Sequence, residues 1–100
     1  MQVNLSFGMN EEILYRIHVT GRVQGVGFRW NAANQARSLG IKGFIKNLPD
    51  GSVYIEAEGN EKELNAFVAW CRSGPSFSSV KNVEVSRAAA SGYKEFKIVH

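Results

Sequence analysis

Residues 13–40 decide the fold, because their pattern changes once and a glycine-rich turn lies at the change. They read ILYRIHVT, GRVQGVG and FRWNAANQARSLG. Side chains alternate over residues 13–20 and are rich in β-branched and aromatic types, which predicts a strand. Three glycines in residues 21–27 then interrupt regular structure. From Phe28 the apolar residues recur at helical spacing as far as Gly40, a typical helix-ending residue, so we expect a strand, a tight turn and a helix.

The same two kinds of pattern recur after residue 40. They predict two strands joined by the turn Pro49-Asp50-Gly51, a second helix and two further strands, at residues 41–48, 53–58, 61–73, 80–87 and 93–99. Asn60, with Glu63 three residues later, matches a capping pair at the start of the second helix. The order predicts an α+β fold, a ferredoxin-like βαββαβ sandwich with an antiparallel sheet, two helices on one face and a short extra C-terminal strand. This architecture hosts many unrelated activities, so it leaves the function open.

Length and composition indicate one ordinary globular domain. The chain has 100 residues, 44% of them hydrophobic and 21% charged, and we expect a flexible arm at residues 1–12 and the domain at residues 13–100. No apolar run reaches the roughly 18 to 20 residues of a membrane helix, and the first 12 residues lack the features of a secretory signal. The single Cys71 allows no internal disulfide, and no residues show metal-ligand spacing. These features favour a cytoplasmic monomer without a metal or cofactor.

The positive charge is concentrated in one half of the chain. The formal net charge is +3, and it lies in residues 1–50, because acids and bases balance in residues 51–100. A basic first half suits an anionic ligand, but the excess is too small to indicate nucleic-acid binding by itself.

The most unusual segment is the turn itself, GRVQGVGFR at residues 21–29. Glycine permits positive φ, so neighbouring N–H groups can converge, and the helix beginning near Phe28 adds unpaired N–H groups. A phosphate-sized anion fits such a site, and Arg29 lies close enough to add its guanidinium. The segment lacks the Gly-Lys-Ser/Thr of a P-loop, and Trp30 stands where a dinucleotide fingerprint needs glycine. Steric relief is the commoner use of such glycines, but it accounts poorly for Gln24 and Arg29 beside them.

A second candidate residue is Asn47, near the end of the strand predicted at residues 41–48. It shares the parity of Ile41 and Ile45, so its side chain should point toward the helix-covered face. A carboxamide carries donors and an acceptor and can hold a water molecule in one orientation. Capping of the following turn is an equally good interpretation.

At these two segments the sequence closely resembles the acylphosphatase family. Residues 21–29 are similar to the family's first signature. Its second is matched by GFIKN at residues 43–47 and then by Gly51, Val53 and Gly59. The resemblance runs from about residue 15 to residue 98. Departures are small: Ile45 is bulkier than the usual residue, and Asn31 replaces a commonly larger side chain near the rim of the site.

This resemblance implies the hydrolysis of acyl phosphates, the mixed anhydrides of a carboxylic acid and phosphate. It implies a phosphate-binding loop formed by Gln24, Gly25, Val26, Gly27, Phe28 and Arg29. It further implies that Arg29 clamps the phosphoryl oxygens and that Asn47 orients the attacking water. No general acid is required, because the conjugate acid of the leaving carboxylate has a pKa of about 4. We expect a small acyl phosphate as the partner, and no nucleic acid or membrane.

Two functions of other classes serve as alternatives. RNA-recognition domains share this order of elements, and Lys42-Gly43-Phe44 begins like one of their motifs, but the match breaks at Ile45 and falls on the second strand rather than the third. A small-anion sensor would use the same loop without turnover and would not depend on Asn47.

Several other side chains have a simpler interpretation than a role in the site. Cys71 lies on the apolar stripe of the second helix and is expected to be a buried, inert thiol. We expect His18 on the surface of the sheet. Trp30 and Trp70 are candidates for a substrate mouth, although packing at helix flanks is the commoner use.

Overall fold

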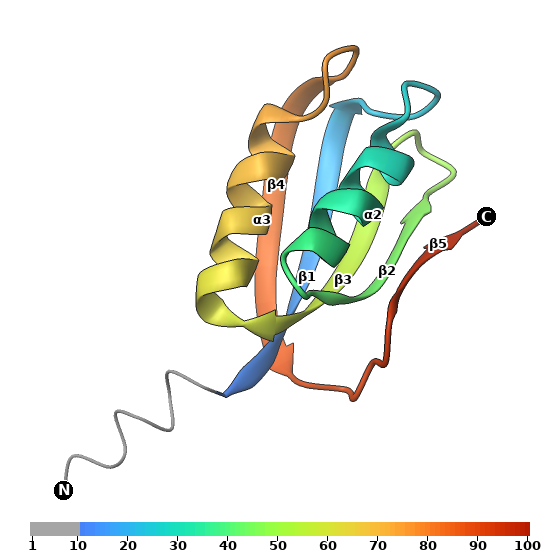
Figure 1. Ribbon diagram of the computed structural model, residues 1–100. Helices are drawn as coiled ribbons and strands as arrows, with labels where there is room; N and C mark the ends of the chain where they lie inside the picture. Colours follow the sequence, from blue (N-terminus) through green and yellow to red (C-terminus); the bar gives the residue numbers. More distant parts are fainter. Residues whose placement is uncertain (1–10) are drawn as a thin grey trace, which may run out of the picture.

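The computed structural model describes residues 11–100, and residues 1–10, most of the expected arm, lie outside the described residues. In chain order the elements are β1 (Glu12–Arg22), α2 (Phe28–Ser38), β2 (Lys42–Asn47), β3 (Val53–Asn60), α3 (Glu61–Ser73), β4 (Ser79–Ala89) and β5 (Phe96–Val99). The predicted order of elements is confirmed (Figure 1). Boundaries agree to within two residues, except that β5 begins at Phe96 instead of residue 93.

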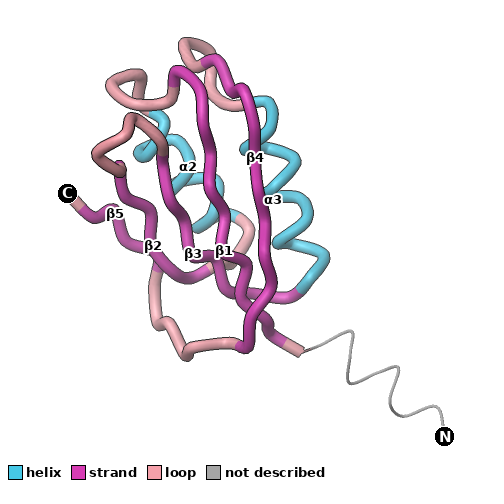
Figure 2. Tube along the Cα trace, turned by 180° about the vertical axis from the view of Figure 1, so that it is seen from behind, coloured by secondary structure: helices cyan, strands magenta, loops and turns pink. Residues whose placement is uncertain are grey.

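The sheet has the strand order β4-β1-β3-β2-β5. The first four strands pair antiparallel, as predicted, whereas β5 runs parallel to β2. Because β4 and β5 lie at opposite edges, residues 90–95 must cross the end of the sheet before pairing can start (Figure 2). The Glu58 carboxylate holds this crossing segment by accepting hydrogen bonds from the N–H groups of Ser91 and Gly92, at 2.7 and 3.1 Å. The crossing therefore explains both the short β5 and its direction.

Both helices cover the same face of the sheet, as predicted (Figure 1). The largest fully buried side chains between the two layers are Ile17, Phe28, Ile45, Ile55, Leu64 and Phe67. The predicted cap of α3 is confirmed, because Asn60 Oδ1 accepts a hydrogen bond from Glu63 N at 3.1 Å. Neither helix within residues 11–100 is long and apolar enough to cross a membrane.

Candidate active site

Residues 23–27 between β1 and α2, called the glycine loop below, have the backbone geometry of an anion site. Gly25 and Gly27 have φ angles of 73° and 79°, in the left-handed region that favours glycine. Gly27 is the N-cap of α2, and the first turn of α2 carries no acidic residue. The first N–H groups of α2 have no partner inside the helix, and the positive end of the helix dipole lies at the loop. A negatively charged group is therefore favoured at this point.

A cavity of about 220 Å³ opens beside the glycine loop. It is lined by Val23, Gly25, Gly27, Phe28, Arg29, Trp30, Asn47, Ile98 and His100. These residues come from the glycine loop, the start of α2, the end of β2 and the last residues of the chain. The cavity thus brings together the two segments that the sequence singled out, with Arg29 and Asn47 on one surface.

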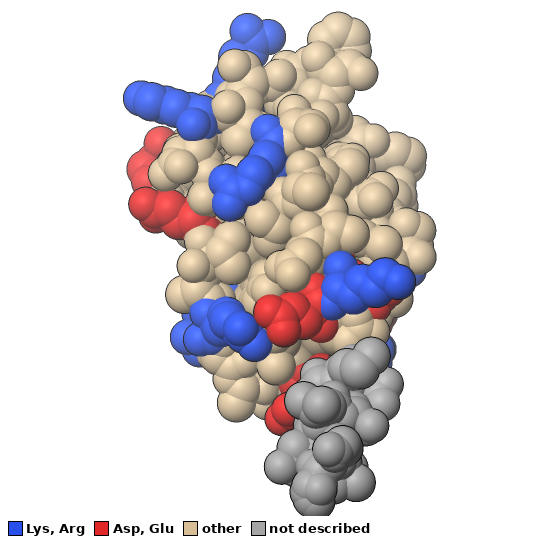
Figure 3. Space-filling view, turned by 90° about the vertical axis from the view of Figure 1, so that its left-hand side faces the viewer, with Lys and Arg blue, Asp and Glu red and all other residues tan. Residues whose placement is uncertain are grey.

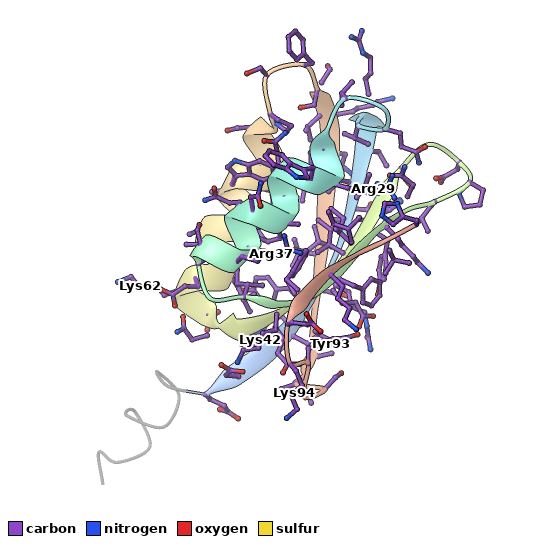
Figure 4. All side chains as sticks on the ribbon, turned by 45° about the vertical axis from the view of Figure 1, so that its right-hand side comes forward. Arg29, Arg37, Lys42, Lys62, Tyr93 and Lys94 are labelled. Carbon is purple, nitrogen blue, oxygen red and sulfur yellow. The ribbon has the colours of Figure 1, made fainter. Side chains whose placement is uncertain are left out.

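Arg29 reaches from the first turn of α2 toward the end of β5 (Figure 4). Its Nη1 donates a hydrogen bond to the backbone oxygen of Val99 at 2.9 Å. This bond uses one of the five N–H donors of a guanidinium and leaves the others for a ligand. Within residues 11–100, no Asp or Glu side chain forms an ion pair with Arg29. The cavity wall therefore carries a guanidinium that forms no ion pair with an Asp or Glu side chain of residues 11–100.

Asn47 is the last residue of β2, and its Oδ1 atom is buried without a hydrogen-bond partner in residues 11–100. The turn that follows uses a different side chain, because Asp50 Oδ1 accepts the hydrogen bond from Ser52 N at 3.0 Å. A buried acceptor without a donor costs about 1 to 3 kcal/mol, so it favours a ligand or water that can donate. Asn47 therefore lies at the cavity with an acceptor that no group of residues 11–100 pairs with.

Four of the six residues expected to bind phosphate line this cavity, namely Gly25, Gly27, Phe28 and Arg29. The other two lie differently. The Gln24 side chain donates from Nε2 to the backbone oxygens of Leu48 and Ser52, at 2.8 Å each. Val26 lines a neighbouring hollow of about 320 Å³ together with Trp70 and Phe77. Gln24 and Val26 can therefore contribute only backbone groups to a ligand at the loop.

Sequence reasoning did not place Ile98 and His100 at the site. They are about 70 residues from the glycine loop, and only the pairing of β5 beside β2 brings them to the cavity. The two tryptophans separate into different roles. Trp30 lines the cavity and is 64% exposed, whereas Trp70 packs against the rings of Phe28 and Phe67 with centroids 5.6 and 6.3 Å away.

His18 and Ser52 are in contact outside the cavity. Their hydrogen bond runs in the wrong direction for the imidazole to activate the hydroxyl as a nucleophile. His18 Nε2 is 2.8 Å from Ser52 Oγ, but the Ser52 hydroxyl donates its proton to Asp50. The imidazole must then donate to Oγ and cannot act there as a base. Cys71 is fully buried, as predicted, and burial raises the pKa of its thiol to about 12. Neither the Ser52 hydroxyl nor the Cys71 thiol is a candidate nucleophile.

Comparison with known proteins identifies the family of this chain. The acylphosphatase family profile matches residues 15–98. The acylphosphatase of Archaeoglobus fulgidus is 48% identical over 88 residues, which cover 88% of this chain and 99% of the relative. The crystal structure of acylphosphatase from Bacillus subtilis superposes with a TM-score of 0.86 at 42% identity, over 88% of this chain and 99% of that one. An acylphosphatase structure from Coxiella burnetii also gives 0.86, at 30% identity, over 89% of this chain and 94% of that one. The chain belongs to the acylphosphatase family.

Proposed function

We propose that this chain hydrolyses acyl phosphates to a carboxylate and inorganic phosphate. The observation that carries the proposal is the cavity in which the glycine loop, Arg29 and Asn47 meet. Family membership supports the same reaction, because relatives similar over most of this chain are named acylphosphatases.

The phosphoryl group is bound by the N–H groups of the glycine loop and the first turn of α2, together with the Arg29 guanidinium. Phosphoryl transfer requires positioning and stabilisation of charge on the phosphoryl oxygens rather than covalent help. Backbone N–H groups and a guanidinium supply this stabilisation without having to change their protonation. Metal assistance is not part of the proposal, and within residues 11–100 no group of acidic, His or Cys side chains has the arrangement of a metal site.

Asn47, which lines the cavity, holds the attacking water through its carboxamide. Its Oδ1 acceptor has no hydrogen-bond partner among the described residues. The water oxygen forms a bond to phosphorus while the bond between phosphorus and the carboxyl oxygen breaks. The electron pair of that bond leaves with the carboxylate, and an oxygen of the substrate's own phosphate takes the proton of the water. Among residues 11–100, no Asp or Glu lines the cavity, which fits a reaction whose leaving group needs no general acid.

The proposal is tested by the hydrolysis of benzoyl phosphate by wild type, Arg29→Ala and Asn47→Ala, with circular dichroism to confirm folding. We expect each variant to lose roughly 100-fold or more in kcat, the scale of removing one stabilising group in acyl or phosphoryl transfer. Inorganic phosphate should inhibit wild type competitively. A lowered affinity in Asn47→Ala with unchanged kcat would contradict the role of Asn47.

An anion sensor would bind phosphate at the same loop without hydrolysing benzoyl phosphate, so the wild-type rate separates the two functions. An RNA-binding module would bind oligonucleotides in a salt-dependent way. The face drawn in Figure 3 carries Lys and Arg interspersed with Asp and Glu instead of one basic patch, which does not favour this alternative.

We further propose that the protein acts in the cytoplasm as a monomer on a small acyl phosphate, without nucleic acid or membrane. The enzyme domain would begin with β1, whose first residue is Glu12 rather than residue 13, and the residues before it would form an arm outside the site. Sedimentation equilibrium at micromolar concentration should give the mass of one 11.1 kDa chain, and a dimer mass would overturn the monomer.

A further inference from the structure

We infer that the Gln24 side chain is a positioning residue, which fixes the glycine loop relative to the turn that follows Asn47. This inference rests on the proposed function and concerns the alignment of the bound phosphate with the attacking water. The side chain would act through the turn, without contacting the substrate.

The contacts of Gln24 join the two segments of the site directly. Its Nε2 donates to the backbone oxygens of Leu48 and Ser52 at 2.8 Å each, so both amide protons are used. These oxygens belong to the turn between β2 and β3, at residues 48–52. The turn is closed by its own bonds, because Leu48 N donates to Ser52 O at 2.8 Å and Gly51 N donates to Leu48 O at 3.1 Å. The Gln24 side chain is therefore hydrogen-bonded to a turn that its own backbone bonds close, and this turn directly follows Asn47.

No other side chain of the glycine loop can make this connection. Its sequence is VQGVG, in which Gln24 is the only polar residue. Val23 is buried in the core, and Val26 faces the neighbouring hollow. The loop itself has bends instead of regular structure, so its backbone has few bonds of its own to set its distance from β2. The two Gln24 hydrogen bonds supply that constraint.

The chemistry of the contact explains why glutamine suits this position. Two carbonyl oxygens require two donors from one group, and a terminal amide provides them in a fixed plane. A misplacement of about 1 Å between reacting groups can lower a rate roughly 100-fold. Loss of the two Gln24 hydrogen bonds should therefore slow the chemical step while leaving the backbone N–H groups that bind phosphate in place.

The test is Gln24→Met, which keeps the length of the side chain and removes both donors. The matched control is Gln35→Met on α2, whose side chain does not line the cavity. With benzoyl phosphate we expect kcat to fall roughly 10- to 100-fold in Gln24→Met and to stay near wild type in the control. The inhibition constant of inorganic phosphate should remain within about threefold, because phosphate needs the loop but not its alignment with Asn47.

A double-mutant cycle with Asn47→Ala gives the discriminating result. If Gln24 acts by placing Asn47, Gln24→Met should cost little once Asn47 is absent, measured on the residual rate at raised enzyme concentration. Fully additive losses, an unchanged kcat in Gln24→Met, or a phosphate inhibition constant that rises as much as kcat falls would each overturn the inference. If Gln24→Met does not fold, the same cycle is run with Gln24→Asn, which keeps the amide on a shorter side chain. The wild-type rate tests the proposed function separately.

Discussion

Arg29 and Asn47 illustrate two different chemical demands within one cavity. Arg29 provides charge and a planar set of donors, one of which binds the Val99 oxygen. Asn47 provides a buried acceptor that has no partner among the residues the structure describes. A transferred phosphoryl group requires the first, and a water held in line with it requires the second.

The planar fork of Arg29 can be tested apart from its charge by Arg29→Lys. Lysine keeps the positive charge but cannot bind the Val99 oxygen and two phosphoryl oxygens in one plane. We expect kcat/KM for benzoyl phosphate to fall at least about tenfold, because a lost charge-assisted hydrogen bond is worth roughly 1.5 to 3 kcal/mol. Activity close to wild type would mean that charge alone is sufficient.

Cys71 provides a second test at the scale of one residue. Its side chain is fully buried on α3, and burial raises the pKa of the thiol to about 12. We expect no reaction of the folded protein with an aromatic disulfide reagent at pH 8, and complete reaction of one thiol in guanidinium chloride. Rapid labelling of the folded protein would show that this part of the core opens readily.

Elements with a strong local pattern could be predicted from the sequence. The alternation in β1 and the capping pair at α3 depend on neighbours along the chain, and both are confirmed. β5 was predicted too long because its start depends on residues 90–95, which cross the end of the sheet and bind Glu58. No local pattern encodes that crossing.

The cap of α3 is tested by Asn60→Ala. The substitution removes the acceptor for Glu63 N, and the loss of such a cap costs about 1 kcal/mol. We expect the free energy of unfolding in urea to fall by about this amount with unchanged hydrolysis, because Asn60 does not line the cavity. The control Asn34→Ala, at an exposed position in the middle of α2, should leave stability unchanged or raise it slightly.

Across the whole molecule, a polar network on the helix-free face of the sheet joins the crossing segment to β3 and β1. The Glu56 carboxylate accepts hydrogen bonds from the hydroxyls of Tyr54 and Tyr93 and lies 3.6 Å from Arg16 Nε. Partial burial and the hydrogen bonds to Glu56 raise the pKa of both tyrosines to about 12. Burial opposes the ionisation of Glu56, but the tyrosine hydrogen bonds and Arg16 outweigh it and lower the pKa of that carboxyl.

These shifts predict how stability depends on pH. The folded protein holds the tyrosine protons more tightly than the unfolded chain, so their contribution is complete below pH 10 and is lost as the pH rises toward about 12. Glu56 acts in the opposite direction: its contribution is present above its ordinary pKa and is lost as the pH falls through the lowered value. Urea unfolding at a series of pH values should show both declines. The double variant Tyr54→Phe with Tyr93→Phe should reduce the loss of unfolding free energy above pH 10. An unchanged loss in that range would contradict this account.

The sequence predicted the two main segments of the candidate site but not the contacts that bring them together. The glycine loop stood out because Gln24 and Arg29 accompany its glycines, and Asn47 because its place in the strand points its side chain toward the helices and because the segment resembles the second acylphosphatase signature. The contacts of Gln24 with the β2–β3 turn and the arrival of Ile98 and His100 depend on how distant strands pair. Such contacts have no counterpart in the local pattern.

The central claim, that the glycine loop and the start of α2 bind a phosphoryl group, is tested most directly by titrating the ¹⁵N-labelled protein with inorganic phosphate. The account predicts saturable shifts of the backbone amide signals of Gly25, Gly27, Phe28 and Arg29, and their loss in Arg29→Ala. Shifts confined to the helix-free face of the sheet, or no saturable shift at these four amides, would contradict it.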